Sequence, residues 1–266
     1  MTTSRIPKRR GRSWPVVTRQ ELRDLWIGGR GLVLTLAFSV LVSVIAYLSA
    51  TNQAINFLEQ REAVSLTLQV GIAVGSLLAL LAAADAVSGE RERGTLEMLL
   101  LTPVSRLGLV GGKLISALSL WVAAFAVTVP FVWFLGRGLG VVSRALIAGA
   151  FVGTLLAIFV ASLGAVISVF SASNRLSLSL GLFVLLALVA PTQLPPGAQK
   201  GWLGDLLIQV NPFAAGLRYV DRIIVRGYGW THEATLLIAP VVGAVLLAAA
   251  AAIVGSRYIS LRGRQG

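Results

Sequence analysis

Long apolar runs separated by short polar segments dominate the pattern along the chain. Six of these runs reach the roughly twenty residues that a helix needs to cross the hydrocarbon core of a bilayer. They lie at 31–50, 64–87, 110–135, 145–170, 177–194 and 235–255. The pattern therefore predicts an all-α polytopic membrane protein, in which six transmembrane helices form one membrane domain over 31–256.

Two segments outside these runs also show helical spacing. In the basic N-terminal segment 1–30, apolar and charged residues alternate over 14–28 in a way that predicts a helix lying in the headgroup layer. Between the fifth and sixth runs, 195–234 predicts two short amphipathic helices on the outer membrane surface. The second should start with Asn211 as N-cap and Pro212 as its first helical residue.

The charge distribution sets the orientation. The 266 residues are 56% hydrophobic and only 13% charged, yet the net charge is +12. A soluble basic face for nucleic acid is not expected, because the Lys and Arg residues gather at the ends of apolar runs. Most of the 23 fall in 1–30, in alternate loops and in the basic tail 257–266, so both termini are predicted to be cytoplasmic. The Lys and Arg residues predicted on the outer side of the membrane are Arg61, Arg137, Arg144, Lys200, Arg218, Arg222 and Arg226.

The chain lacks the residues that metal and nucleotide chemistry need. It has no cysteine and a single histidine, His232, so neither a Cys/His metal site nor a bound cofactor is expected. The stretch closest to a nucleotide-binding loop, 108–114, is one residue too short and lacks the final Ser or Thr. We therefore do not expect the chain to be an enzyme by itself.

Charged residues concentrate between the second and third runs. The segment 89–106 reads G-E-R-E-R-G-T-L-E-M-L-L-L-T-P-V-S-R. Glu90 can pair with Arg93 across one helical turn, which favours a helix that continues beyond the bilayer. Gly94 predicts a bend, and Thr95 can N-cap a second short helix that the proline ends. This second helix would be apolar on nearly all sides, so it needs a covering partner.

This segment resembles the cytoplasmic signature of ABC-2 type permeases, the membrane subunits of bacterial ATP-driven transporters. The six spans, the basic N-terminal helix and the helices between spans five and six are also similar to that family. The resemblance implies that a coupling helix over 90–106 docks on a separate ATPase subunit. The coupling residues would be Glu90, Arg91, Glu92, Arg93, Thr95, Leu96, Glu97, Leu99, Leu100 and Arg106.

The resemblance also implies the assembly. Two ATPase subunits, which hold ATP and Mg, would act with two permeases, the second being another copy or a homologue. The complex would lie in the bacterial cytoplasmic membrane, and export is the expected direction. The segment 195–234 would face the exit side, where an extracytoplasmic partner has access to it.

A few polar residues lie within the apolar runs, namely Asp85, Gln69 and Thr128. We expect Asp85 to pair with a basic residue of the N-terminal helix, although a place in the substrate pathway is the alternative. Two other functions stay open. One is a secondary transporter without an ATPase, in which Asp85 handles protons. The other is a permease-like subunit that transmits ATPase motion to an extracytoplasmic partner.

Overall fold

A computed structural model describes residues 14–51, 57–95, 106–193 and 202–258, and these ranges are helical apart from short connections. Six helices are long and apolar enough to cross a membrane, namely α2, α3, α5, α6, α7 and α10, which confirms the predicted fold class. The elements in order are α1 (Trp14–Trp26), α2 (Arg30–Thr51), α3 (Phe57–Glu92), α5 (Arg106–Leu135), α6 (Val142–Phe170), α7 (Asn174–Val189), η1 (Ala190–Gln193), α8 (Trp202–Val210), α9 (Pro212–Ile224), η2 (Ala234–Leu237) and α10 (Ile238–Tyr258).

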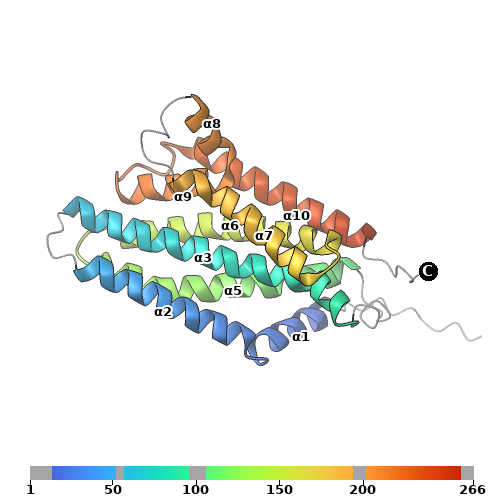
Figure 1. Ribbon diagram of the computed structural model, residues 1–266. Helices are drawn as coiled ribbons and strands as arrows, with labels where there is room; N and C mark the ends of the chain where they lie inside the picture. The colour runs from blue at the N-terminus through green and yellow to red at the C-terminus, as the bar shows by residue number, and fades with distance from the viewer. Residues whose placement is uncertain (1–13, 52–56, 96–105, 194–201, 259–266) are drawn as a thin grey trace, which may run out of the picture.

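The long helices lie side by side, and α1 and the described end of α10 occur at the same end of the bundle (Figure 1). We call this the Asp85 end, and the opposite end, where α3 begins, the α9 end. Helices α3 and α6 form the centre, since 56% of the apolar window of each is buried against at most 28% for the other spans. Helix α3 packs along α6 and also contacts α2, α5, α7 and α9. A displacement of α3 would therefore reach most of the bundle.

Glycines allow a tryptophan to enter the centre of the bundle. Trp121 of α5 is buried, and its indole nitrogen donates a hydrogen bond of 3.1 Å to Thr154 Oγ1. A Cβ atom on Gly75 of α3 would lie 2.8 Å from the indole, and one on Gly153 of α6 only 2.2 Å from it. The ring thus occupies space that two glycines leave open, and it joins α3, α5 and α6.

The start of α9 is held as the sequence predicts. Asn211 caps the helix by accepting hydrogen bonds from the backbone nitrogens of Phe213 and Ala214, and Pro212 occupies the first turn. The Asn211 side-chain nitrogen also donates to the carbonyl oxygen of Leu188 at 2.7 Å, which ties α9 to α7. The apolar face of α9 is buried against the bundle, where it contacts α3, α6, α7 and α10.

Candidate functional site

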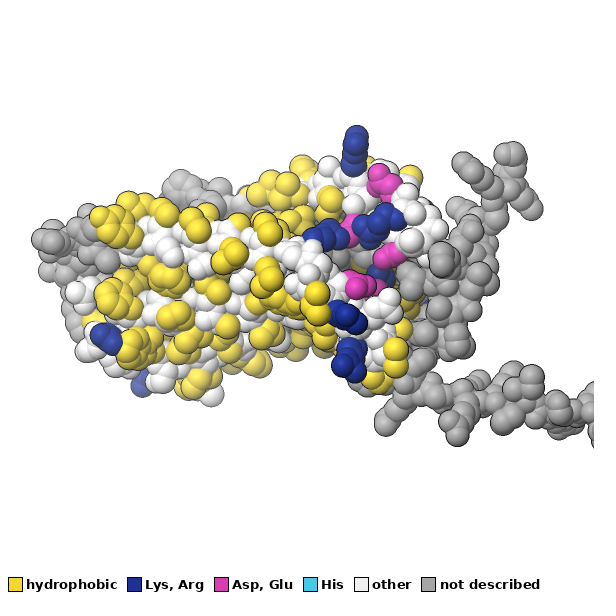
Figure 2. All heavy atoms as spheres, turned by 90° about the horizontal axis from the view of Figure 1, so that it is seen from below, with side chains coloured by type: hydrophobic (Ala, Val, Ile, Leu, Met, Phe, Trp, Pro, Cys, Tyr) yellow, Lys and Arg dark blue, Asp and Glu magenta, His cyan; other side chains and the backbone are white. Residues whose placement is uncertain are grey.

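Acidic and basic side chains gather at the Asp85 end, whereas the flank of the bundle beside them is mostly apolar (Figure 2). Four helix segments supply them: α1, the start of α2, the end of α3 and the start of α5. We call this set the charge network. Its members are Glu21, Arg30, Asp85, Glu90, Arg93 and Lys113.

Lys113 is the most buried member of the charge network, with its side chain 7% exposed. Its ammonium lies 2.8 Å from Glu21 Oε1 on α1 and 3.3 Å from Glu90 Oε1 on α3. A buried cation is tolerated only when anions compensate it, and here two carboxylates from different helices do so. Lys113 therefore joins α1, α3 and α5 at one point.

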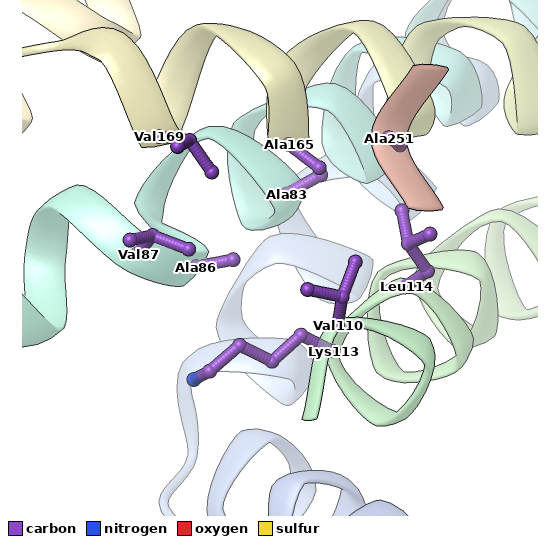
Figure 3. A pocket seen from close by; sticks show the side chains of 9 residues that line it. All are labelled: Ala83, Ala86, Val87, Val110, Lys113, Leu114, Ala165, Val169 and Ala251. Carbon is purple, nitrogen blue, oxygen red and sulfur yellow. The ribbon is translucent and has the colours of Figure 1, made fainter. Parts of the chain in front are cut away.

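The Lys113 stem also borders a small apolar pocket between α3, α5, α6 and α10, with the ammonium turned away from it (Figure 3). The pocket holds about 10 Å³, close to the space of a single water molecule. It is lined largely by Ala and Val side chains, so few polar groups are available to hold a water. The long methylene chain thus packs on apolar surface while its charge reaches the network.

Asp85 forms ion pairs with two arginines. Its Oδ2 lies 3.3 Å from an Arg30 nitrogen and 3.5 Å from an Arg93 nitrogen. We expected the basic partner to lie in the N-terminal helix, α1. Arg30 instead is the first residue of α2. A Cβ on Gly89 would lie 2.1 Å from Asp85 Oδ1, so a glycine one turn later makes room for the carboxylate.

The end of α3 is closed by backbone and side-chain bonds. The Thr95 nitrogen donates to the Glu90 carbonyl oxygen and the Gly94 nitrogen to that of Arg91, the pattern of a Schellman motif with Gly94 at φ 71°. The Thr95 hydroxyl donates to a Glu90 carboxylate oxygen. Glu90 Oε1 also lies 3.6 Å from an Arg93 nitrogen, which confirms the predicted pair.

Two further residues bind the turn between α6 and α7. The Arg91 guanidinium donates to the carbonyl oxygens of Ser171 at 2.6 Å and Val169 at 3.1 Å, at the end of α6. Glu92 Oε2 accepts a hydrogen bond of 3.1 Å from the backbone nitrogen of Asn174, at the start of α7. A cation thus meets the negative end of one helix and an anion the positive end of the next.

Hydroxyl groups strengthen the same junction. Ser168 Oγ of α6 accepts from the backbone nitrogens of Val87 and Ser88 of α3, at 3.0 and 2.9 Å. Ser177 of α7 donates to the carbonyl oxygen of Ala84 at 2.8 Å. The sequence reasoning missed these serines, although a serine within an apolar run is a signal of hydrogen bonding between helices.

Some of the predicted coupling residues make contacts within the chain, and others lie outside the described residues. The side chains of Glu90, Arg91, Glu92 and Arg93 all make contacts within the chain. The Arg106 guanidinium donates to the Ser256 carbonyl oxygen of α10 at 3.4 Å. Leu96, Glu97, Leu99 and Leu100 lie outside the described residues.

The polar residues predicted near the pathway lie away from the charge network. Thr128 is fully buried, donates to the Ala124 carbonyl oxygen and lies where a side chain on Gly71 would be. The Gln69 side-chain nitrogen donates to Ser65 Oγ at 2.9 Å, towards the α9 end. In the part of the chain that the structure describes, no group of three or more His, Asp or Glu residues is placed to hold a metal ion.

The comparison with protein families agrees with a permease. Residues 16–258 match the family described as ABC-2 family transporter protein. This match covers every described helix except the first residues of α1. A search of curated proteins found no match. With six apolar helices and a family match over most of its length, the chain is a multi-pass membrane protein that belongs to the ABC-2 transporter family.

Proposed function

We propose that the chain is the permease subunit of an ATP-driven exporter and that a separate ATPase subunit docks on 90–106. The observation that carries this proposal is the way α3 ends. Its last two turns are fastened to α1, α2 and α5 through the charge network and to the α6 and α7 termini through Arg91 and Glu92. A force on the chain after Gly94 would therefore move several spans together.

The contacts refine the role of the charged residues. Glu90, Arg91, Glu92 and Arg93 fasten the segment to the bundle, which leaves Leu96, Glu97, Leu99 and Leu100 as the proposed docking residues. Firm attachment is what coupling requires, because a loose connection would absorb the motion of the partner. ATP and Mg would bind in the ATPase, of which two copies would serve two permeases.

In the proposed orientation, the Asp85 end and both termini lie on the cytoplasmic side of a bacterial inner membrane. Positive residues lie at this end, as the positive-inside rule favours: Arg19 and Arg23 of α1, Arg91 of α3, Arg93 in the turn after it, and Arg257 of α10. Asp85 lies at the membrane boundary between two arginines, and this placement favours a structural ion pair over proton transport in a secondary transporter.

A second function is favoured by the connection of α9 to the bundle. Helix α9 contacts α3, α6, α7 and α10, while α8 exposes Trp202, Leu206, Leu207 and Val210. Motion of α3 would thus reach surfaces at the α9 end that could hold an extracytoplasmic partner over 195–234. In that case the chain would transmit ATPase motion to the partner.

The test is purification of the tagged chain from its own membrane, with identification of the proteins that accompany it. We expect an ATPase to co-purify with the wild-type chain and with Glu62→Lys, an exposed position of α3 at the α9 end. Leu99→Asp should lose the ATPase. Charge reversal at Glu90 or Glu92 should separate ATP hydrolysis from transport. A Leu99→Asp chain that retains the ATPase and transports at the wild-type rate would contradict the proposal.

A further inference from the structure

Four arginines converge at the α9 end of the bundle, where the proposed coupling makes no use of them. Arg218 and Arg222 belong to α9, and Arg226 lies in the turn that follows it. Arg61, near the start of α3, reaches this turn, because its guanidinium lies 3.6 Å from where a Cβ on Gly227 would be. We call these four residues the arginine cluster. The fold brings them together from two distant parts of the sequence.

The positive charges act on one another. Arg218, Arg222 and Arg226 follow at intervals of four residues, so they lie near one side of the helix and its extension. Arg222 is partly buried, and its pKa is lowered first by desolvation and then by the charges of Arg218 and Arg226. A guanidinium nevertheless remains protonated at physiological pH, so proton loss does not relieve this repulsion. An anion would relieve it.

Two acidic side chains beside the cluster already have partners. Glu233 pairs with Arg222, and Asp221 Oδ1 accepts a hydrogen bond of 2.9 Å from Ser65. Within 14–51, 57–95, 106–193 and 202–258, neither Arg218 nor Arg226 forms an ion pair with an acidic side chain. Their donors are therefore available to a ligand with negative charge.

Aromatic and apolar side chains indicate the depth of the cluster in the membrane. Helix α8 exposes Trp202 and Val210, with 75% and 69% of their surface accessible. Trp230 is exposed as well, and its carbonyl oxygen accepts a hydrogen bond of 2.8 Å from the Tyr219 hydroxyl of α9. Tryptophan and tyrosine are enriched at the level of lipid headgroups. These aromatic residues therefore favour a depth for the α9 end at which lipid phosphate groups occur.

We propose that the arginine cluster binds the phosphate group of an anionic lipid headgroup in the leaflet at the α9 end. Guanidinium groups match phosphate oxygens with paired hydrogen bonds, and Arg218 and Arg226 supply the free donors. This inference goes beyond the proposed function and stands without it, since it needs only the bilayer that surrounds the helices.

The test is native mass spectrometry of the detergent-purified protein with phosphatidylglycerol or phosphatidylcholine. We expect retention of phosphatidylglycerol by the wild-type protein and about fivefold weaker binding for each arginine removed in Arg218→Gln and Arg226→Gln. Arg144→Gln, at an exposed position in the first turn of α6 at the same end, is the matched control and should bind as the wild type does. Arg218→Lys and Arg226→Lys keep the positive charge and should bind phosphatidylglycerol more tightly than the corresponding Gln variants.

Two further measurements complete the test. Added salt should release phosphatidylglycerol from the wild-type protein, which tests the charge without any substitution. Inorganic phosphate in lipid-free detergent should raise the unfolding temperature less than phosphatidylglycerol does. If inorganic phosphate stabilises the protein as much as phosphatidylglycerol does, the proposal of a lipid ligand is wrong and the ligand is a soluble anion. Equal phosphatidylglycerol binding by the wild-type, Arg218→Gln and Arg226→Gln proteins would overturn the site.

Discussion

The Arg91 guanidinium lies 2.6 Å from the carbonyl oxygen of Ser171, so the last turn of α3 is bonded directly to the residue that ends α6. The neighbouring Glu92 binds the first backbone nitrogen of α7. Two consecutive side chains thus bind the end of α6 and the start of α7. The turn between these two helices lies about eighty residues further along the sequence. This arrangement makes the α6–α7 turn part of the proposed coupling route.

Replacement of Arg91 tests that route. Arg91→Gln loses the charged hydrogen bonds to Ser171 and Val169 and should lower the free energy of unfolding by about 1 kcal/mol, because the side chain is largely exposed. In the complex with the ATPase, less substrate should be moved for each ATP hydrolysed. Arg175→Gln, an exposed change in the first turn of α7, should leave this ratio unchanged. An unaltered ratio in Arg91→Gln would exclude the turn from the route.

Lys113→Met should destabilise the protein strongly. The change leaves Glu21 and Glu90 without their shared cation in a partly buried place, for which we expect a loss of about 3 kcal/mol. Addition of Glu21→Gln and Glu90→Gln should restore part of the loss, because the remaining negative charges disappear. Thermal unfolding in detergent measures both, with the exposed Arg175→Gln as control. No recovery in the triple variant would mean that packing, and not charge, governs this position.

The space around Trp121 predicts the effect of one added methyl group. A Cβ in Gly153→Ala would lie 2.2 Å from the Trp121 ring, so the helices must move apart at a cost of about 1–3 kcal/mol. Addition of Trp121→Leu should recover part of this loss. Gly111→Ala, where a Cβ meets no atom within 4 Å, should be neutral or stabilising. Unfolding temperatures and expression yields of the four proteins check the prediction, and a harmless Gly153→Ala would refute the described packing.

Local signals predicted the parts of the fold that depend on neighbouring residues. Apolar length predicted the six spans, Asn211 with Pro212 predicted the start of α9, and Gly94 predicted a bend, which the structure shows as a positive φ just after α3. Each of these features follows from backbone preference or from the thickness of a bilayer. The Glu90 and Arg93 pair was predictable for the same reason, since one helical turn separates the two residues.

Contacts between distant helices were not predictable in the same way. The sequence indicates that Lys113 carries a charge near a boundary, but the choice of Glu21 as partner depends on how α1 rotates against α5. The binding of Arg91 to α6 carbonyl oxygens leaves no pattern in the sequence, because backbone acceptors are the same for every residue type. The place of Trp121 between two glycines likewise needs the positions of three helices.

The conformation of Gly94 has a consequence for engineering. Its φ of 71° directs the chain away from α3, yet a Cβ added there would meet no atom within 4 Å. The exit angle is therefore governed by a dihedral preference and not by steric contact. Asn tolerates this region better than other residues with a Cβ, whereas a β-branched residue would avoid it. Substitution at this single position would change the direction in which the chain leaves α3, while the contacts that hold the end of α3 stay in place.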